Sequence, residues 1–318
     1  MGSAVKHWLF LLFTVPTVCV AQAFPSKPIK IIVPLAAGGT GDTLARLVGE
    51  GLGKTLGGTV IVENRPGSGG TIGTEAVARA APDGYTLMHT SASHIANAAL
   101  RPKLTYDAIR DFAVLARTAD THQLLVANPS FPPNTVQELI EYCKVNRVFY
   151  GSSGNGSSTH LNMELLKSLA GIPMEHVPYK GSTQSRTDLI AGQIQLSVDG
   201  LVPTLPLIRA GKLKAIALAS SRRSMVAPEI PTIAEAGVPA YQTDTWYALY
   251  APAGLSAELL QKLRSATTAA LQSTALREKF LQQGAEPTDP NPALLEKQMR
   301  EDYARWARLV SEAGLKVD

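Results

Sequence analysis

The sequence predicts an α/β protein of two domains, each a largely parallel sheet with helices on its faces. Apolar strand-like runs alternate with amphipathic helix-like runs along most of the chain, which is typical of parallel sheets connected by helices. Two glycine-rich turns, at 35–42 and 151–160, each stand between an apolar run and an amphipathic run. A chain of 318 residues with 45% hydrophobic content is long enough to form two separate cores.

The first turn has the sequence Leu-Ala-Ala-Gly-Gly-Thr-Gly-Asp and separates an apolar strand at 29–33 from a predicted helix at 42–56. The first N–H groups of a helix have no partner within the helix, and the helix dipole adds partial positive charge there. Such a turn can therefore hold an anion, and its glycines let the backbone approach the ligand closely.

The second turn follows the apolar run 148–150 and opens a helical stretch at 161–169. One glycine-rich turn after a strand is often only a tight connection, so the interpretation depends on the pair. Neither turn fits a nucleotide motif: Leu44 stands where a dinucleotide fingerprint needs its third glycine, and no Gly-Lys-Ser/Thr follows either run. We therefore expect two domains that face one small acidic ligand.

Residues 1–23 are typical of an export signal. Lys6 precedes an apolar run at 8–20, and residues 21–23 read Ala-Gln-Ala, which has the small residues of a cleavage site. The apolar run is too short to be a convincing membrane span, although an uncleaved anchor is the alternative. We expect a cleavable signal peptide, a mature chain that begins near Phe24, and a periplasmic location.

The composition excludes several classes of function. The formal net charge of +4 is mild, and no basic block with interleaved aromatic residues is present, so nucleic acid is not an expected partner. The predicted mature chain keeps one cysteine, Cys143, which cannot form an internal disulfide and lies in a helical pattern as a buried apolar residue. The six histidines are scattered, and we expect neither a metal nor a cofactor.

The remaining elements follow the same alternation and suggest a discontinuous first domain. Short strands are predicted at 60–62 and 85–89, separated by a glycine-rich turn at 64–70 and a helix at 71–80 that Pro82-Asp-Gly84 ends. The segment 124–243 has strands at 124–127, 148–150, 175–177, 194–198 and 215–219, with helices beginning near 135, 159, 182 and 205. A strand at 246–251 and helices at 256–273 and 292–313 close the chain.

From this order we predict one domain from 24–123 plus 244–318 and a second from 124–243. The chain then crosses between the domains twice, and two crossings make a hinge about which the domains close on a ligand. In open parallel sheets, ligands bind at the carboxyl ends of strands. Both glycine-rich turns occupy such positions.

Several longer runs match a known family. These are Pro28–Pro34, Gly38–Gly39 with Asp42, Glu63–Gly70, Pro82–Leu87, Tyr106–Asp107 with Asp111–Phe112, Gly154–His160, Val177–Gly181, Ala210–Lys212, Pro231–Gly237, Trp246, Ala251–Gly254 and Arg305–Trp306 through Gly314. Through them the predicted mature chain resembles, over essentially its whole length, the solute-binding receptors of tripartite tricarboxylate transporters, called the Bug family.

The resemblance implies a type II periplasmic-binding-protein fold, in which two Rossmann-like α/β domains enclose a ligand cleft. It also implies a monomeric receptor that captures a small carboxylate and delivers it to the membrane permease subunits of the transporter. The ligand could be a dicarboxylate or tricarboxylate, an acidic amino acid or an aromatic acid. In the family, a carboxylate is held by both glycine-rich turns, through backbone N–H groups, hydroxyls and ordered waters.

Carried onto this chain, the resemblance implies ligand-binding residues in the two turns, in the run after the third strand, and at the end of the strand 194–198. They are Leu35, Ala37, Gly38, Gly39, Thr40, Ser91, Ser93, His94, Ser153, Asn155, Gly156, Ser157, Thr159, His160 and Asp199. The chain departs from the family at Ala37, where proline is common, and at Ala98, which replaces the proline of a frequent Asn-Pro pair.

Some of these residues could have a structural role and not contact the ligand. Asp42 is expected to cap or border the first helix. His94 and His160 could each donate to a carboxylate or hold their own loops. Asp199 has no cationic partner nearby in sequence, so if it faces the cleft it favours ligands with a positive or hydroxyl group. Trp246 is expected to pack near the domain crossing.

Two other classes of function remain as alternatives. A periplasmic hydrolase would need a nucleophile motif, but the second glycine of residues 151–154 comes one residue too early for Gly-x-Ser-x-Gly. No His-Glu-x-x-His metalloprotease motif is present either, so we expect a binding protein and not an enzyme. A ligand-sensing subunit that docks on a membrane sensor needs the same closing cleft and stays open.

Overall fold

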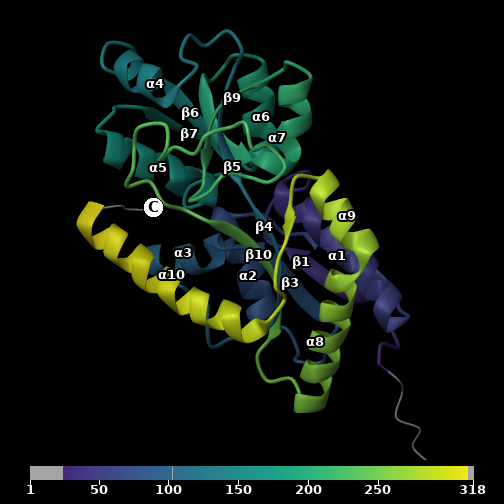
Figure 1. The fold of residues 1–318 in the computed structure, drawn as a ribbon. Coiled ribbons are helices and arrows are strands. Elements are labelled where there is room, and N and C mark those ends of the chain that lie inside the picture. Colours follow the sequence, from purple (N-terminus) through teal and green to yellow (C-terminus); the bar gives the residue numbers. More distant parts are fainter. Residues whose placement is uncertain (1–23, 102, 314–318) are drawn as a thin grey trace, which may run out of the picture.

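The computed structural model describes residues 24–101 and 103–313. The predicted signal peptide lies outside these residues. They form two sheets, each with its own helices, which we call lobe 1 and lobe 2 (Figure 1). The chain passes from lobe 1 to lobe 2 between Thr121 and Gln123, and it returns before Thr245. Within the described ranges, no helix is both long and apolar enough to cross a membrane.

Lobe 1 contains a six-stranded sheet in the order β11-β4-β10-β3-β1-β2. Its strands are β1 (Ile29–Val33), β2 (Val60–Asn64), β3 (Thr86–Ser91), β4 (Phe112–Thr121), β10 (Thr245–Pro252) and β11 (Glu286–Pro287). β1 pairs in parallel with β2 and β3, but β10 runs antiparallel to β3 and β4. The expectation of a largely parallel sheet is therefore wrong at β10 and β11. For β10 the physical reason is that the chain re-enters lobe 1 at the edge where the parallel strands end.

Helices cover both faces of this sheet (Figure 1). One face carries α1 (Thr40–Leu56), α8 (Ala257–Gln272) and α9 (Thr274–Gln282), and the other carries η1 (Ser68–Gly70), α2 (Thr71–Ala78), α3 (Ser93–Leu100) and α10 (Pro292–Ala313). Ile31 and Val33 of β1 pack toward the first group, whereas Ile32 packs toward the second. Both faces of β1 are thus buried, which explains why its sequence is almost continuously apolar.

Lobe 2 has a five-stranded sheet in the order β7-β6-β8-β5-β9. Its strands are β5 (Gln123–Ala127), β6 (Phe149–Ser152), β7 (Glu175–Pro178), β8 (Leu196–Gly200) and β9 (Lys214–Ala219), and its helices are α4 (Val136–Cys143), α5 (Ser158–Ala170), α6 (Ser182–Ile190) and α7 (Leu201–Arg209). β6 pairs in parallel with β7 and β8, while β5 runs antiparallel to both of its neighbours. β5 is the strand that enters from lobe 1. Cys143 is the last residue of α4 and is buried in the core of lobe 2, as expected.

Four elements are absent from the sequence prediction: α3, β4, α9 and β11. β4 lies between β10 and β11, yet its sequence includes two charged residues that interrupt the apolar pattern. The structure pairs these residues with each other, because Arg117 lies 2.6 Å from the Asp120 carboxylate. Trp246 at the start of β10 is fully buried and donates to Asp302 of α10 at 2.9 Å, which agrees with the expected packing role.

A buried polar cluster fastens the crossing between the lobes. His122, the residue between β4 and β5, lies 2.9 Å from the Glu286 carboxylate of β11. The same carboxylate accepts from the Met225 N–H at 2.8 Å and pairs with Arg222 at 2.7 Å. Burial opposes ionisation of Glu286, but the hydrogen bonds from Met225 and Arg222 outweigh it and keep the pKa of this carboxyl below its usual value. Segments from both sides of the crossing therefore meet at one side chain.

Replacing Glu286 with alanine should leave His122 and the Met225 N–H buried without an acceptor. We expect Glu286→Ala to lower the free energy of unfolding by about 3 kcal/mol, because buried polar groups without partners are costly. Urea unfolding measures this, with Glu258→Ala, an exposed residue of α8, as the matched control. Equal and small losses in both variants would contradict a fastening role for the cluster.

Candidate ligand-binding site

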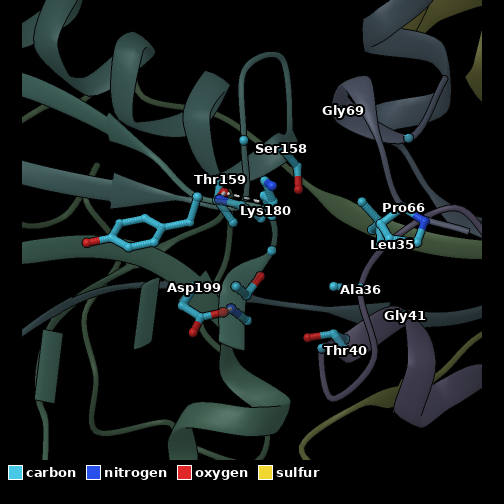
Figure 2. Close-up of a pocket in the computed structure, with 18 of the residues that line it drawn as sticks. Leu35, Ala36, Thr40, Gly41, Pro66, Gly69, Ser158, Thr159, Lys180 and Asp199 are labelled. Carbon is cyan, nitrogen blue, oxygen red and sulfur yellow. Dashed lines mark hydrogen bonds between the residues drawn. The ribbon is translucent and has the colours of Figure 1, made fainter. Parts of the chain in front are cut away.

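A cavity of about 520 Å³ lies between the two lobes, and both lobes line it (Figure 2). Most of its lining comes from turns that follow parallel strands and precede helices. These are Leu35–Gly41 after β1, Pro66–Gly70 after β2, Ser153–Thr159 after β6, Pro178–Ser182 from the last residue of β7 onward, and Asp199–Gly200 at the end of β8, each in whole or in part. The carboxyl ends of parallel strands meet at one edge of a sheet, so the N-termini of the following helices converge on the cavity. Their free N–H groups and dipoles favour a bound anion.

The first predicted turn contributes Leu35, Gly39 and Thr40 to the cavity. Ala37 and Gly38 do not line it. The Gly38 N–H donates to the Asp42 carboxylate at 3.0 Å, so Asp42 orders its own turn, in line with the structural role expected for it. Burial opposes ionisation of Asp42, but the Gly38 hydrogen bond and Arg46 keep the pKa of its carboxyl below the usual value.

The second predicted turn contributes Ser153, Asn155 and Thr159 to the lining. The Thr159 hydroxyl accepts from the Ser153 N–H at 2.9 Å, which closes the turn. Gly156, Ser157 and His160 lie behind this surface and do not line the cavity. Ser157 caps α5, with its hydroxyl accepting from the His160 N–H at 3.3 Å.

His160 holds its own turn. Its ring Nδ1 accepts from the Gly156 N–H at 3.1 Å, and its ring stacks on that of His176 with centroids 4.1 Å apart. Burial lowers the pKa of His160, which keeps the ring neutral and Nδ1 able to accept. Of the two roles considered for His160, the structure shows the local one.

Ser91, Ser93 and His94 do not line the cavity. The two serine hydroxyls lie 2.8 Å apart and are buried. His94 contacts the Ala108 carbonyl at 2.8 Å and packs edge-on against Phe112. The reason is that the return strand β10 pairs along β3 and covers its end, so this run faces the core of lobe 1.

Asp199 lines the cavity at the end of β8 and is 4% exposed (Figure 2). Its carboxylate accepts from Arg186 of α6 at 2.8 Å and from the Gly200 N–H at 2.7 Å. Asp199 has no cation close to it in the sequence, but α6 packs beside β8 and brings Arg186 to it. Burial raises the pKa of Asp199 while Arg186 opposes that rise. The ion pair with Arg186 balances the negative charge of Asp199 at the cavity.

Several lining residues lie outside the sequence-based list. The turns after β2 and β7 carry the same signal as the two recognised turns, a strand followed by a glycine and a helix. Gln123, Tyr247 and Arg101 have no such local signal, because they reach the cavity from the crossing strands and from the end of α3. Gln123 donates to the Ser158 hydroxyl at 2.8 Å and so joins the crossing to the second turn.

The lobes touch on more than one side of this cavity. Thr183 of α6 donates to the Ala37 carbonyl at 3.1 Å. Arg101 donates to the Asn155 carbonyl at 3.2 Å. Gly181 (φ +151°) lies so close to the first turn that a methyl group there would be 2.5 Å from the Ala36 side chain. The cavity is therefore shaped by contacts between the lobes.

In the described residues, no group of His, Cys, Asp or Glu side chains could hold a metal ion.

This fold, two α/β lobes around a shared cavity, is the type II periplasmic-binding-protein fold, which defines a class of solute-binding receptors and not of enzymes. A family model described as "Tripartite tricarboxylate transporter family receptor" matches residues 44–315, and the chain belongs to this family. The resemblance drawn from the sequence motifs is thus confirmed.

Related proteins agree over most of their length. Protein BugT of Bordetella pertussis is 36% identical over 93% of this chain and 92% of its own. The structure of the periplasmic binding protein BugD is 34% identical with a TM-score of 0.88, and covers 92% of this chain and 99% of its own. MatC from Rhodopseudomonas palustris, solved with bound malate, is 35% identical with a TM-score of 0.85, covering 90% of this chain and 100% of its own.

The buried histidines predict a loss of stability in acid. Burial lowers the pKa of both His89 and His94 to about 4, below the unfolded value near 6.5. Both rings are therefore neutral in the folded state, and their contribution is complete above the unfolded pKa and is lost as the pH falls toward the folded one. Each should account for about 2–3 kcal/mol of unfolding free energy lost between about pH 7 and pH 4.

His94→Gln tests this directly, because glutamine can still donate to the Ala108 carbonyl but does not titrate. We expect the variant to lose about 2–3 kcal/mol less than the unmodified protein over the same pH range in urea unfolding. An identical loss in both proteins would show that His94 takes no part in the acid dependence.

Proposed function

We propose that this chain is a periplasmic receptor that captures a small carboxylate between its lobes and delivers it to a tripartite-type permease. The observation that carries the proposal is the convergence of helix-opening turns from both lobes on one cavity. Backbone N–H groups and hydroxyls of such turns bind anions without a covalent step. The bound malate of the related MatC, a dicarboxylate, supports the same ligand class.

The proposed organisation follows from this function. We propose that residues 1–23 are a cleaved signal peptide, that 24–123 plus 244–318 form one domain, and that 124–243 form the other. The two crossings, at His122 and just before Thr245, then act as the hinge. We also propose that the receptor works as a monomer. A ligand sensor that passes its signal to a membrane partner would use the same cavity. The cavity therefore supports ligand capture, and delivery to a permease is a further step of the proposal.

Capture would combine contacts from both lobes. We propose that ligand contacts come from Leu35, Gly39 and Thr40 in lobe 1 and from Ser153, Asn155 and Thr159 in lobe 2, with Asp199 beside them. Ala37, Gly38, Ser91, Ser93, His94, Gly156, Ser157 and His160 would then support these surfaces from behind. Tyr247 adds a buried phenol whose pKa is raised by burial, so it stays protonated and able to donate.

A thermal-shift screen of the purified protein tests carboxylate capture. The panel contains dicarboxylates, tricarboxylates, acidic amino acids and aromatic acids, each with its neutral amide. A ligand at about 100 times its Kd stabilises the folded state by about 2.7 kcal/mol, which raises Tm by several degrees. We expect a rise for one acid class and none for its amide. A rise only with uncharged solutes would contradict the anion site.

Closure of the lobes can be tested at Gly181. A methyl group at this position meets Ala36 across the cavity rim, so Gly181→Ala should hold the lobes apart and weaken ligand affinity about 10-fold or more. Gly211→Ala is the matched control, because Gly211 also has a positive φ (+68°) but its added methyl meets nothing within 4 Å. Similar affinity in both variants, measured by calorimetry, would mean that binding does not need this contact.

A further inference from the structure

The cavity has two ends, and each is made by turns from both lobes. At one end, the first turn lies against the turn after β7 and the end of β8: added methyl groups on Gly181 and Gly200 would meet Ala36 and Thr40 respectively. At the other end, the turn after β2 lies against the second turn, since a methyl on Gly69 would be 2.8 Å from the Asn155 carbonyl. We call the second the Arg101 end, because Arg101 bridges the same two turns.

The two ends differ in charge. Among the described residues, the charged side chains that line the cavity are Arg101, Lys180 and Asp199. Asp199 is neutralised by Arg186. Arg101 and Lys180 have no carboxylate within 4.0 Å in the described ranges, so their positive charges are not balanced by the protein there. The cavity therefore has an excess of positive charge.

The guanidinium of Arg101 has bonds left to make. One of its terminal nitrogens donates to the Ser68 hydroxyl at 3.2 Å, and the other donates to the Asn155 carbonyl at 3.2 Å. Both acceptors are neutral. The Nε–H group is buried and has no hydrogen-bond partner in the part of the chain that the structure describes. A buried N–H without an acceptor is costly, and a planar guanidinium is suited to carboxylate oxygens.

We propose that Arg101 is a specificity-determining residue that receives a second anionic group of the ligand. Its ligand is then a two-ended anion: one carboxylate lies at the helix-opening turns of the opposite end, and the other lies at Arg101, with Lys180 beside the path between them. This inference depends on the proposed carboxylate capture and narrows the expected ligands to those with two anionic groups. A monocarboxylate, or the monoamide of a diacid, leaves the charge of Arg101 unbalanced in the closed cavity.

The position of Arg101 also links ligand recognition to lobe contact. Arg101 lies at the end of α3 in lobe 1, and its Asn155 acceptor lies in the second turn in lobe 2. The guanidinium proposed to receive the second anionic group is therefore the same group that joins the two lobes at this end of the cavity.

Isothermal calorimetry with matched ligand pairs tests the proposal. The ligands are succinate, malate, glutarate and adipate, each with its monoamide, and the proteins are the unmodified chain, Arg101→Gln and Arg101→Lys. Arg277→Gln, an exposed arginine of α9, is the control. We expect the unmodified protein to prefer the best diacid over its monoamide by about 10-fold or more. Arg101→Gln should reduce this preference to within about 3-fold, because the diacid loses much more affinity than the monoamide.

The other outcomes separate the claims. Arg101→Lys should keep part of the preference, since it keeps the charge without the planar fork. An equal loss for diacid and monoamide in Arg101→Gln would show that Arg101 acts only through Asn155, and would overturn the proposal. Equal binding of diacid and monoamide by the unmodified protein would also overturn it, while carboxylate capture would stand. Binding of no carboxylate at all would reject the proposed function itself.

Discussion

The site depends on one geometric constraint: parallel strands end at the same edge of a sheet, so the helices that follow them begin there. In both lobes that edge faces the other lobe, and five junctions between a strand and the next helix bring backbone N–H groups and helix N-termini to one cavity. Each helix contributes a partial positive charge at its start. The positive electrostatic potential of the cavity therefore follows from the order and direction of its strands and helices, and individual side chains only modify it.

The strands that break the parallel pattern are the ones that connect the lobes. β5 and β10 both begin at the edge between the lobes and run away from it, against their neighbours. They place Gln123 and Tyr247 on the floor of the cavity, and the connection at His122 is fastened by Glu286. The segments that connect the lobes thus also form part of the binding surface. A movement of one lobe relative to the other would therefore move residues that contact the ligand.

Much of this could be read from the sequence, because strand, glycine turn and helix are local patterns. The two turns predicted to bind an anion both contribute to the cavity, and so do the turns after β2 and β7, which have the same pattern but were not predicted to bind ligand. Ser91, Ser93 and His94 follow a strand in the same way but lie in the core, since β10 covers the end of β3. The Arg186 partner of Asp199 and the reach of Arg101 come from packing between elements, which no local pattern reports.

The most direct test of the central claim is an NMR titration of isotope-labelled protein with a carboxylate that raises its Tm. Backbone N–H groups that donate to a carboxylate in the cavity should show large shifts, above all those of Gly39, Thr40, Ser158 and Thr159, at the starts of α1 and α5. The neutral amide of the same ligand should leave them unchanged. Shifts confined to residues outside the cavity, or equal shifts with the amide, would contradict an anion site built from helix N-termini.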